Sequence, residues 1–160
     1  RETSVSPPDP LCREDSFAHD PHPVPVTTFR YRREPSAAFG SILRPVASMV
    51  LATKAVTLEV AMYIDSGADM TLIPLKLGRS LGFRQRPTER ILELSGISGA
   101  GVPYVLRTAR IRIGNQAFTI RVAWALIEDV PLLLGRTDIF PRFQILFDEK
   151  RHRVTFTPHA

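Results

Sequence analysis

Residues 56–65 form an alternating pattern that predicts a β-strand with one apolar face. That face carries Val56, Leu58, Val60, Met62 and Ile64. Asp65 ends the opposite face, so its side chain is held rigidly without lying under the core. An acid in this position needs a reason, because burying an unpaired carboxylate is costly. The strand therefore places a carboxylate at the edge of a packed sheet.

The strand runs into Asp65-Ser66-Gly67-Ala68, an acid followed by a hydroxyl residue, a glycine and a small residue. Gly67 lets the backbone turn and approach closely, which a Cβ would hinder. The chain has no second Asp-Ser-Gly or Asp-Thr-Gly segment, and Asp69 lies too near in sequence to be an equivalent partner for Asp65. Any reaction that needs two such aspartates therefore requires the second one to come from outside this segment.

Most of the remaining chain predicts short strands. The candidates are residues 27–32, 42–51, 102–113, 118–124, 132–134, 143–147 and 154–156. Gly114-Asn115 marks a hairpin turn between two of them. A short helix is expected over residues 75–81, with Pro74 at its first position and Gly82 closing it. The pattern predicts one mainly β, barrel-like domain with one or two short helices.

Residues 1–26 are Pro-rich and predict a flexible tail, which leaves residues 27–160 as the folded domain. His19, His22 and Cys12 lie in this tail without fixed geometry or a fourth ligand, so we expect no metal site. Because Cys12 is the single cysteine, no disulfide can form within one chain, and we expect a reducing, cytoplasmic location. Whether a targeting segment precedes Arg1 is left open.

The net charge of +5 comes mostly from arginines that are spread along the predicted strands, apart from Arg30, Arg32 and Arg33. This spread favours solvated strand faces and ion pairs over a nucleic-acid-binding patch. We therefore expect no nucleic-acid partner. We also expect no membrane segment, since no apolar run reaches the roughly 18 residues that a membrane helix needs.

Two further features follow the Asp65 segment in order. The first is a glycine-rich hairpin tip, Ser95-Gly96-Ile97-Ser98-Gly99-Ala100-Gly101, about 30 residues after Asp65. Glycines favour a plain β-turn in any case, so a mobile loop and a simple turn both remain open. The second is Leu133-Leu134-Gly135-Arg136 followed by Thr137-Asp138-Ile139-Phe140, an apolar strand that leads into a helical turn.

These three features resemble, in the same order, the segments of retropepsin-like aspartic proteases, and the resemblance covers residues 42–158. It is strongest to bacterial single-lobe members, where Leu-Gly-Arg, a Phe-rich turn and a Phe-Asp hairpin recur. Phe140-Pro141-Arg142-Phe143 and Phe147-Asp148-Glu149 fit that pattern. Ser66 stands where threonine is commoner, and the glycine-rich tip is longer and less glycine-dense than in viral enzymes. The resemblance implies a single-lobe, closed β-barrel of the acid protease fold.

The resemblance also implies roles for individual residues. Asp65 matches the catalytic acid, with Ser66, Gly67, Ala68 and Arg136 supporting it. Ser66 matches the hydroxyl residue that bonds across the two-fold axis of a dimer. Substrate binding is expected from Asp69 and from a flap formed by Gly96, Ile97, Ser98 and Gly99. Asp69 matches the acid that binds the substrate main chain and pairs with Arg136.

Two carboxylates that share one proton can hydrolyse a peptide bond, because one activates water while the other polarises the carbonyl. With one such segment per chain, the resemblance implies a homodimeric aspartic endopeptidase that takes an extended peptide and needs no cofactor. The cleft is expected to be apolar, which favours large hydrophobic residues around the cut. The alternative is a catalytically silent module of the same fold that dimerises or binds peptides.

Overall fold

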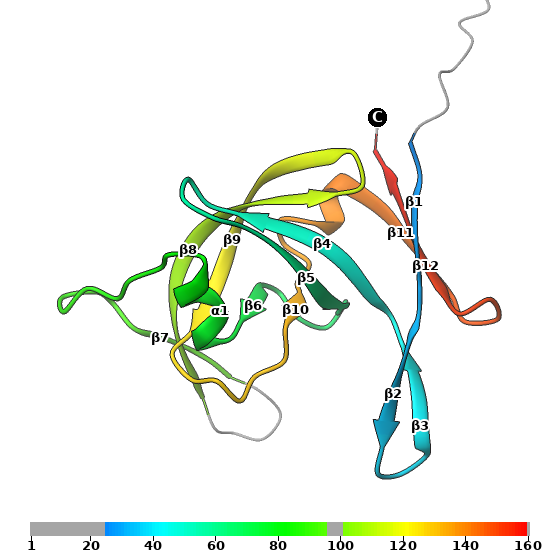
Figure 1. The fold of residues 1–160 in the computed structure, drawn as a ribbon, viewed down its shortest axis with the longest axis horizontal. Coiled ribbons are helices and arrows are strands. Elements are labelled where there is room, and N and C mark those ends of the chain that lie inside the picture. The colour runs from blue at the N-terminus through cyan, green and yellow to red at the C-terminus, as the bar shows by residue number, and fades with distance from the viewer. Residues whose placement is uncertain (1–24, 96–100, 160) are drawn as a thin grey trace, which may run out of the picture.

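The computed structural model describes residues 25–95 and 101–159 (Figure 1). Its strands are β1 (Thr27–Arg30), β2 (Arg32–Ser36), β3 (Gly40–Arg44), β4 (Val46–Ala52), β5 (Thr57–Ile64), β6 (Thr71–Ile73), β7 (Leu92–Leu94), β8 (Val102–Ile113), β9 (Gln116–Ala125), β10 (Leu133–Leu134), β11 (Phe143–Asp148) and β12 (Arg153–Pro158). The helices are α1 (Leu75–Ser80) and the 3-10 helix η1 (Phe140–Arg142). The predicted mainly β fold with one or two short helices is confirmed.

The main sheet closes into a barrel. Its strands pair in the order β4-β5-β10-β6-β9-β8, and β8 pairs back onto β4, where Leu51 lies opposite Ile111. β7 adds to the outer edge of β8. The predicted apolar face of β8 points inward, and Val105, Ala109 and Ile111 on it are buried. Alternation along the long strands therefore sets which side chains fill the barrel.

A second sheet, in the order β1-β12-β11, packs against the barrel core (Figure 1). Phe156 of β12 meets Phe29 and Phe143 edge-to-face, with ring centroids 5.9 and 5.6 Å apart. Phe143 and Phe156 belong to the same buried cluster as Met49 of β4. The two ends of the domain are thus joined in one sheet, since Thr27 of β1 lies opposite Phe156.

Strands β2 and β3 form a hairpin that extends away from the barrel (Figure 1). We call residues 32–44 the arm. A turn over residues 37–39 joins its two strands, which were not predicted as a hairpin. The single strand expected over residues 42–51 is wrong, because Pro45 separates β3 from β4. Proline has no N–H for a ladder hydrogen bond, so the chain changes partners there.

Helix α1 packs on the barrel beside β9. The indole Nε1 of Trp124 donates to the carbonyl of Leu75 at 3.1 Å. The expected end of this helix is confirmed at Gly82, which has a φ of +86°. Its start differs from the prediction, because Pro74 is the N-cap with extended backbone rather than the first helical residue. Within the described chain no helix is long and apolar enough to cross a membrane.

Candidate active site

Asp65 directly follows β5, between strands on both sides. The N–H of Ile64 donates to the carbonyl of Pro45 at 2.9 Å, and the N–H of Asp65 itself donates to the carbonyl of Leu134 at 3.2 Å. β5 and β10 run parallel there, with Ile64 opposite Leu134. The main chain at Asp65 is therefore fixed by neighbours on either side, while its side chain is only partly buried.

A tight turn orients the carboxylate of Asp65. Its Oδ1 accepts a hydrogen bond from the N–H of Gly67 at 2.8 Å. A Cβ placed on Gly67 would lie 3.2 Å from that same oxygen. Ser66 lies in the exposed part of the turn. The small residue at position 67 is thus needed for close approach to the acid rather than for a left-handed backbone.

The predicted second signature lies against the first. The N–H of Arg136 donates to the carbonyl of Ala68 at 2.9 Å, and this hydrogen bond joins the segment after β10 to the turn that follows Asp65. A Cβ on Gly135 would lie 2.1 Å from the carbonyl carbon of Met70, so only glycine allows the two segments to cross. The hydroxyl of buried Thr71 accepts the N–H of Gly135 at 3.3 Å. The two motifs form one structural unit through their backbones.

Asp69 and Arg136 are brought near each other, but the expected ion pair between them does not occur in the described part of the chain. The carbonyl of Asp69 is instead held by Thr137, and both charged side chains are exposed. The acid of this region that is paired is Asp138. Its oxygens accept Nε and Nη2 of Arg121 at 3.1 and 2.7 Å. This hydrogen-bonded guanidinium lowers the pKa of Asp138.

The side chain of Asp65 lines a cavity of about 530 Å³ between β5, the approach to β10 and the base of the arm. Pro45, Pro131 and Leu133 give this cavity apolar walls, and Arg44 and Glu34 give it a charged wall. Asp65 is thus the acid that connects a rigid strand end to an open space. A water molecule and part of a substrate could be held there.

The comparisons with known proteins agree with this geometry. The sequence profile of the aspartyl protease family matches residues 56–137, which include both signature segments. The chain belongs to the aspartyl protease family. A retropepsin-like aspartic protease from Rickettsia conorii has the same fold, with a TM-score of 0.56 and 17% identity over 84% of this chain and 92% of that one.

A second solved structure, the EIAV protease complexed with the inhibitor HBY-793, has a TM-score of 0.48 and 20% identity over 61% of this chain and 86% of that one. No curated protein matches the chain. The predicted acid protease fold is confirmed by the barrel together with the Rickettsia structure. The residue roles remain proposals.

The predicted flap residues of this family member, Gly96, Ile97, Ser98 and Gly99, lie outside the described residues. The strands on either side of that segment do pair, with Leu92 opposite Tyr104 and Leu94 opposite Val102. A group of three or more side chains suited to a metal ion does not occur in residues 25–95 and 101–159.

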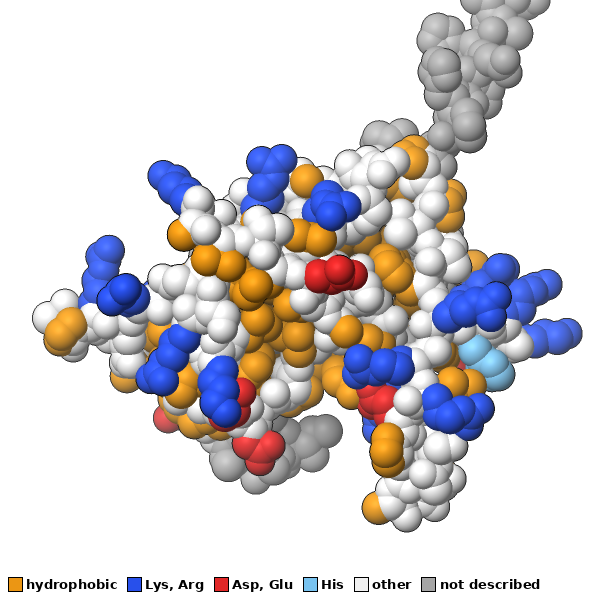
Figure 2. All heavy atoms as spheres, in the orientation of Figure 1, with side chains coloured by type: hydrophobic (Ala, Val, Ile, Leu, Met, Phe, Trp, Pro, Cys, Tyr) orange, Lys and Arg blue, Asp and Glu red, His pale blue; other side chains and the backbone are white. Residues whose placement is uncertain are grey.

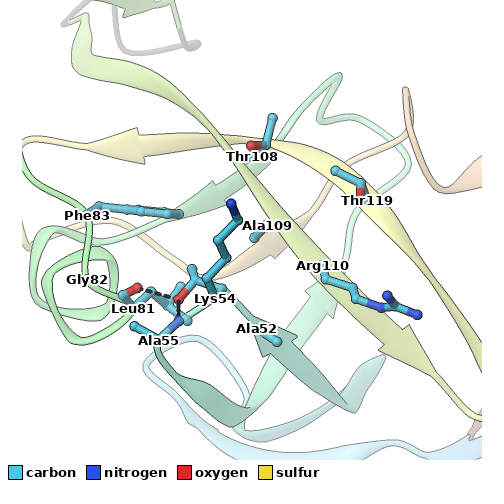
Figure 3. A pocket seen from close by; sticks show the side chains of 11 residues that line it. Ala52, Lys54, Ala55, Leu81, Gly82, Phe83, Thr108, Ala109, Arg110 and Thr119 are labelled. Atoms are coloured by element: carbon cyan, nitrogen blue, oxygen red, sulfur yellow. Dashed lines mark hydrogen bonds between the residues drawn. The ribbon is translucent and has the colours of Figure 1, made fainter.

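A larger cavity, about 690 Å³, lies elsewhere in the described part of the chain (Figure 3). It is bordered by Phe83, Lys54 and Arg110, and none of the predicted site residues lines it. Thr53 shapes its floor by donating its hydroxyl to the carbonyl of Leu81 at 2.9 Å. A search by cavity size alone would therefore not have identified the cavity that Asp65 lines.

Sequence reasoning missed several residues that build the site. Thr71 and Thr137 tie the two signatures together, and Asp138 with Arg121 fixes the turn after Gly135. The one available signal was the run Arg136-Thr137-Asp138, since polar residues after a buried strand often form turn contacts. The charged base of the arm had no sequence signal, because its partners lie on separate strands.

Proposed function

We propose that this chain is one subunit of a homodimeric aspartic endopeptidase in which each subunit contributes one Asp65. The observation that carries the proposal is the partly buried carboxylate of Asp65. It is held at a rigid strand end inside the matched family segment, and it faces a cavity. Rigid placement of a reacting group is what a catalytic acid or base requires.

The need for a second copy follows from the other carboxylate of the cavity. Glu34 lines it with Asp65, but both of its oxygens are already engaged by Arg32, Arg44 and Tyr63. These contacts, first the hydrogen bond from Tyr63, lower the pKa of Glu34 and keep it ionised. A carboxylate whose two oxygens are already engaged by these three side chains is not free to share a proton with Asp65, so we infer that the partner acid comes from a second subunit.

In the proposed reaction the two Asp65 carboxyl groups share one proton. The ionised one takes a proton from water, whose oxygen attacks the peptide carbonyl, and the protonated one donates to the carbonyl oxygen. Transfer of a proton to the leaving nitrogen then breaks the C–N bond, which yields a carboxylic acid and an amine. Ser66 would brace the pair across the axis, while Asp69 and residues 96–99 would hold an extended peptide as an added strand.

Peptide-library cleavage by wild type and by Asp65→Asn tests the activity. We expect cleavage by wild type alone, because the amide cannot act as a general base. Equal cleavage by both proteins would mean that the activity comes from a contaminant. Cleavage by neither would favour the alternative function, a catalytically silent module that dimerises or binds peptides.

A mixing experiment tests the shared site. Titrating wild type with Asp65→Asn under conditions of subunit exchange should lower activity per wild-type subunit to about half in an equimolar mixture, because only pairs of intact subunits are active. Sedimentation of the same samples reports the dimer. A strict monomer at high concentration, or activity that does not respond to mixing, would contradict the shared dyad.

A further inference from the structure

Four side chains form a group linked by hydrogen bonds and ion pairs where the arm meets the barrel. The hydroxyl of Tyr63 donates to Oε2 of Glu34 at 2.6 Å, and Nε of Arg32 donates to Oε1 at 2.8 Å. Nε of Arg44 lies 3.4 Å from Oε2. Figure 2 shows acidic and basic side chains side by side at the base of the arm. We call Arg32, Glu34, Arg44 and Tyr63 the arm cluster.

The arm cluster is anchored to the strand that carries Asp65. Tyr63 precedes Asp65 by two positions, so both side chains lie on the same face of that strand. The guanidinium carbons of Arg32 and Arg44 lie 5.8 and 5.9 Å from the centre of the Tyr63 ring, within the range of cation–π attraction. The position of both arginines is therefore fixed relative to Asp65.

The exposed side of the arm cluster is cationic. Two arginines against one glutamate leave one net positive charge, and Tyr63 stays neutral because its bond to Glu34 raises the pKa of its hydroxyl. The side chain of Glu34 is 15% exposed, whereas that of Arg44 is 49% exposed. Among the described residues, the terminal nitrogens of Arg44 donate no hydrogen bond to the protein. A free pair of N–H groups suits a carboxylate ligand.

Arg44, but not Arg32, lines the cavity shared with Asp65, beside the apolar walls formed by Pro45 and Leu133. A side chain with an aliphatic stem and a terminal acid would match this combination, since the stem can pack on the apolar wall while the acid meets the guanidinium. Asp65 adds negative charge to the same cavity. Selection of an acidic substrate side chain must therefore come from direct contact with Arg44 and not from the overall charge of the cavity.

We propose that Arg44 and the arm cluster form a subsite that selects substrates with a glutamate side chain close to the scissile bond. This inference rests on the proposed peptidase function and narrows its substrate class. It also changes the expectation of a wholly apolar cleft, because at least one pocket beside Asp65 has a charged wall.

Matched peptides test the subsite. Pairs that differ only by Glu or Gln at each position within four residues of the cut are compared by kcat/KM. We expect wild type to prefer glutamate at one position by about fivefold, the scale of one partly exposed ion pair. Arg44→Gln should remove this preference, and Arg44→Lys should restore part of it, since a lysine keeps the charge without the forked geometry.

Arg33→Gln is the matched control. Arg33 lies on the same hairpin, bonds to the hydroxyl of Ser41 at 2.9 Å and does not line the cavity. It should keep the full glutamate preference. Equal cleavage of Glu and Gln peptides by wild type, or an unchanged preference in Arg44→Gln, would overturn the subsite while leaving the peptidase intact. Loss of the preference together with loss of the dimer in sedimentation would also overturn it, since Arg44 would then act at the interface.

Binding separates the subsite from catalysis. Fluorescence polarisation with the same peptides on Asp65→Asn should show the same glutamate preference, and the double variant with Arg44→Gln should lose it. If wild type cleaves no peptide but this binding preference is present, the proposed peptidase fails and the acid-selective subsite stands. If Glu and Gln peptides bind equally, the subsite is wrong whatever the enzyme activity.

Discussion

Thr137 holds the carbonyl oxygen of Asp69 with two hydrogen bonds, from its N–H at 2.9 Å and from its hydroxyl at 2.6 Å. The contact joins residues that are far apart in sequence and stabilises the loop between Asp65 and β6. Replacing Thr137 by valine keeps the shape of the side chain and removes the hydroxyl. We expect a loss of about 1 kcal/mol in the free energy of unfolding, the usual net value of one such bond.

Urea denaturation at neutral pH measures this loss. Thr137→Ser, which keeps the hydroxyl, is the control and should retain most of the stability. Because the bond positions the loop that follows Asp65, Thr137→Val should also lower peptidase activity by more than Thr137→Ser does. Equal stability of the two variants would show that the hydroxyl contributes nothing here.

Gly135 is the second position where the signatures meet. Since a Cβ there would overlap the backbone of Met70 and Thr71, Gly135→Ala must push two main-chain segments apart. We expect destabilisation of about 3 kcal/mol, at the upper end for overpacking. Gly82→Ala is the comparison, because Gly82 has open space around its Cβ position and only an unfavourable φ of +86°.

Gly82→Ala should therefore cost only about 1–2 kcal/mol, the penalty of the left-handed backbone. Thermal or denaturant unfolding of both variants ranks the two effects. If Gly135→Ala were the milder substitution, the close crossing of the two signatures would not be a constraint on the fold.

The pair of Asp138 and Arg121 predicts a loss of stability in acid. Because the bound guanidinium lowers the pKa of Asp138, the contribution is fully present above the unfolded pKa of about 3.9 and is lost as the pH falls through the lower folded pKa. The side chain of Arg121 is 53% exposed, so the contribution is about 0.2–1 kcal/mol.

Asp138→Asn isolates this pair, since the amide oxygen still accepts the backbone N–H of Arg121. Its deficit in unfolding free energy against wild type should be present at pH 6 and shrink toward pH 2. Added salt should also shrink it at pH 6. A deficit that is independent of both pH and salt would mean that the charge of Asp138 has no role.

Much of the barrel could be predicted from the sequence, because the inward faces of β5 and β8 follow a local period of two. The arm could not be predicted in this way. Its strands are short, have few apolar residues and pair only with each other, so no buried face imposes a pattern. The start of α1 was misjudged because the N–H of Lys76 is held by Glu128, a partner that no local rule identifies.

The candidate site likewise has a part that local sequence patterns predict and a part that they do not. Asp65, Gly67, Gly135 and Arg136 carry recognisable motifs, since each is constrained by its immediate neighbours. The residues that link these motifs, such as Thr71 and Thr137, make contacts between strands whose pairing cannot be read from the sequence. The ion pair assigned to Asp69 and Arg136 illustrates the limit, because a motif indicates which residues are close but not which side chains meet. The pairing of Arg121 with Asp138 depends on the register of the whole barrel.

Gly67→Ala tests how closely the turn controls the carboxylate of Asp65, the proposed catalytic group. The new Cβ would lie 3.2 Å from Oδ1 of Asp65, a contact tight enough to shift that oxygen or to lengthen its 2.8 Å bond to the N–H of residue 67. Small displacements of a reacting group are costly to rate, so we expect kcat/KM to fall about tenfold or more. Because Gly67 is exposed and has no left-handed φ, the free energy of unfolding should change by less than about 0.5 kcal/mol. Steady-state cleavage and urea unfolding are measured on the same preparation, and a variant that keeps full activity would show that the turn at Gly67 does not set the geometry of Asp65.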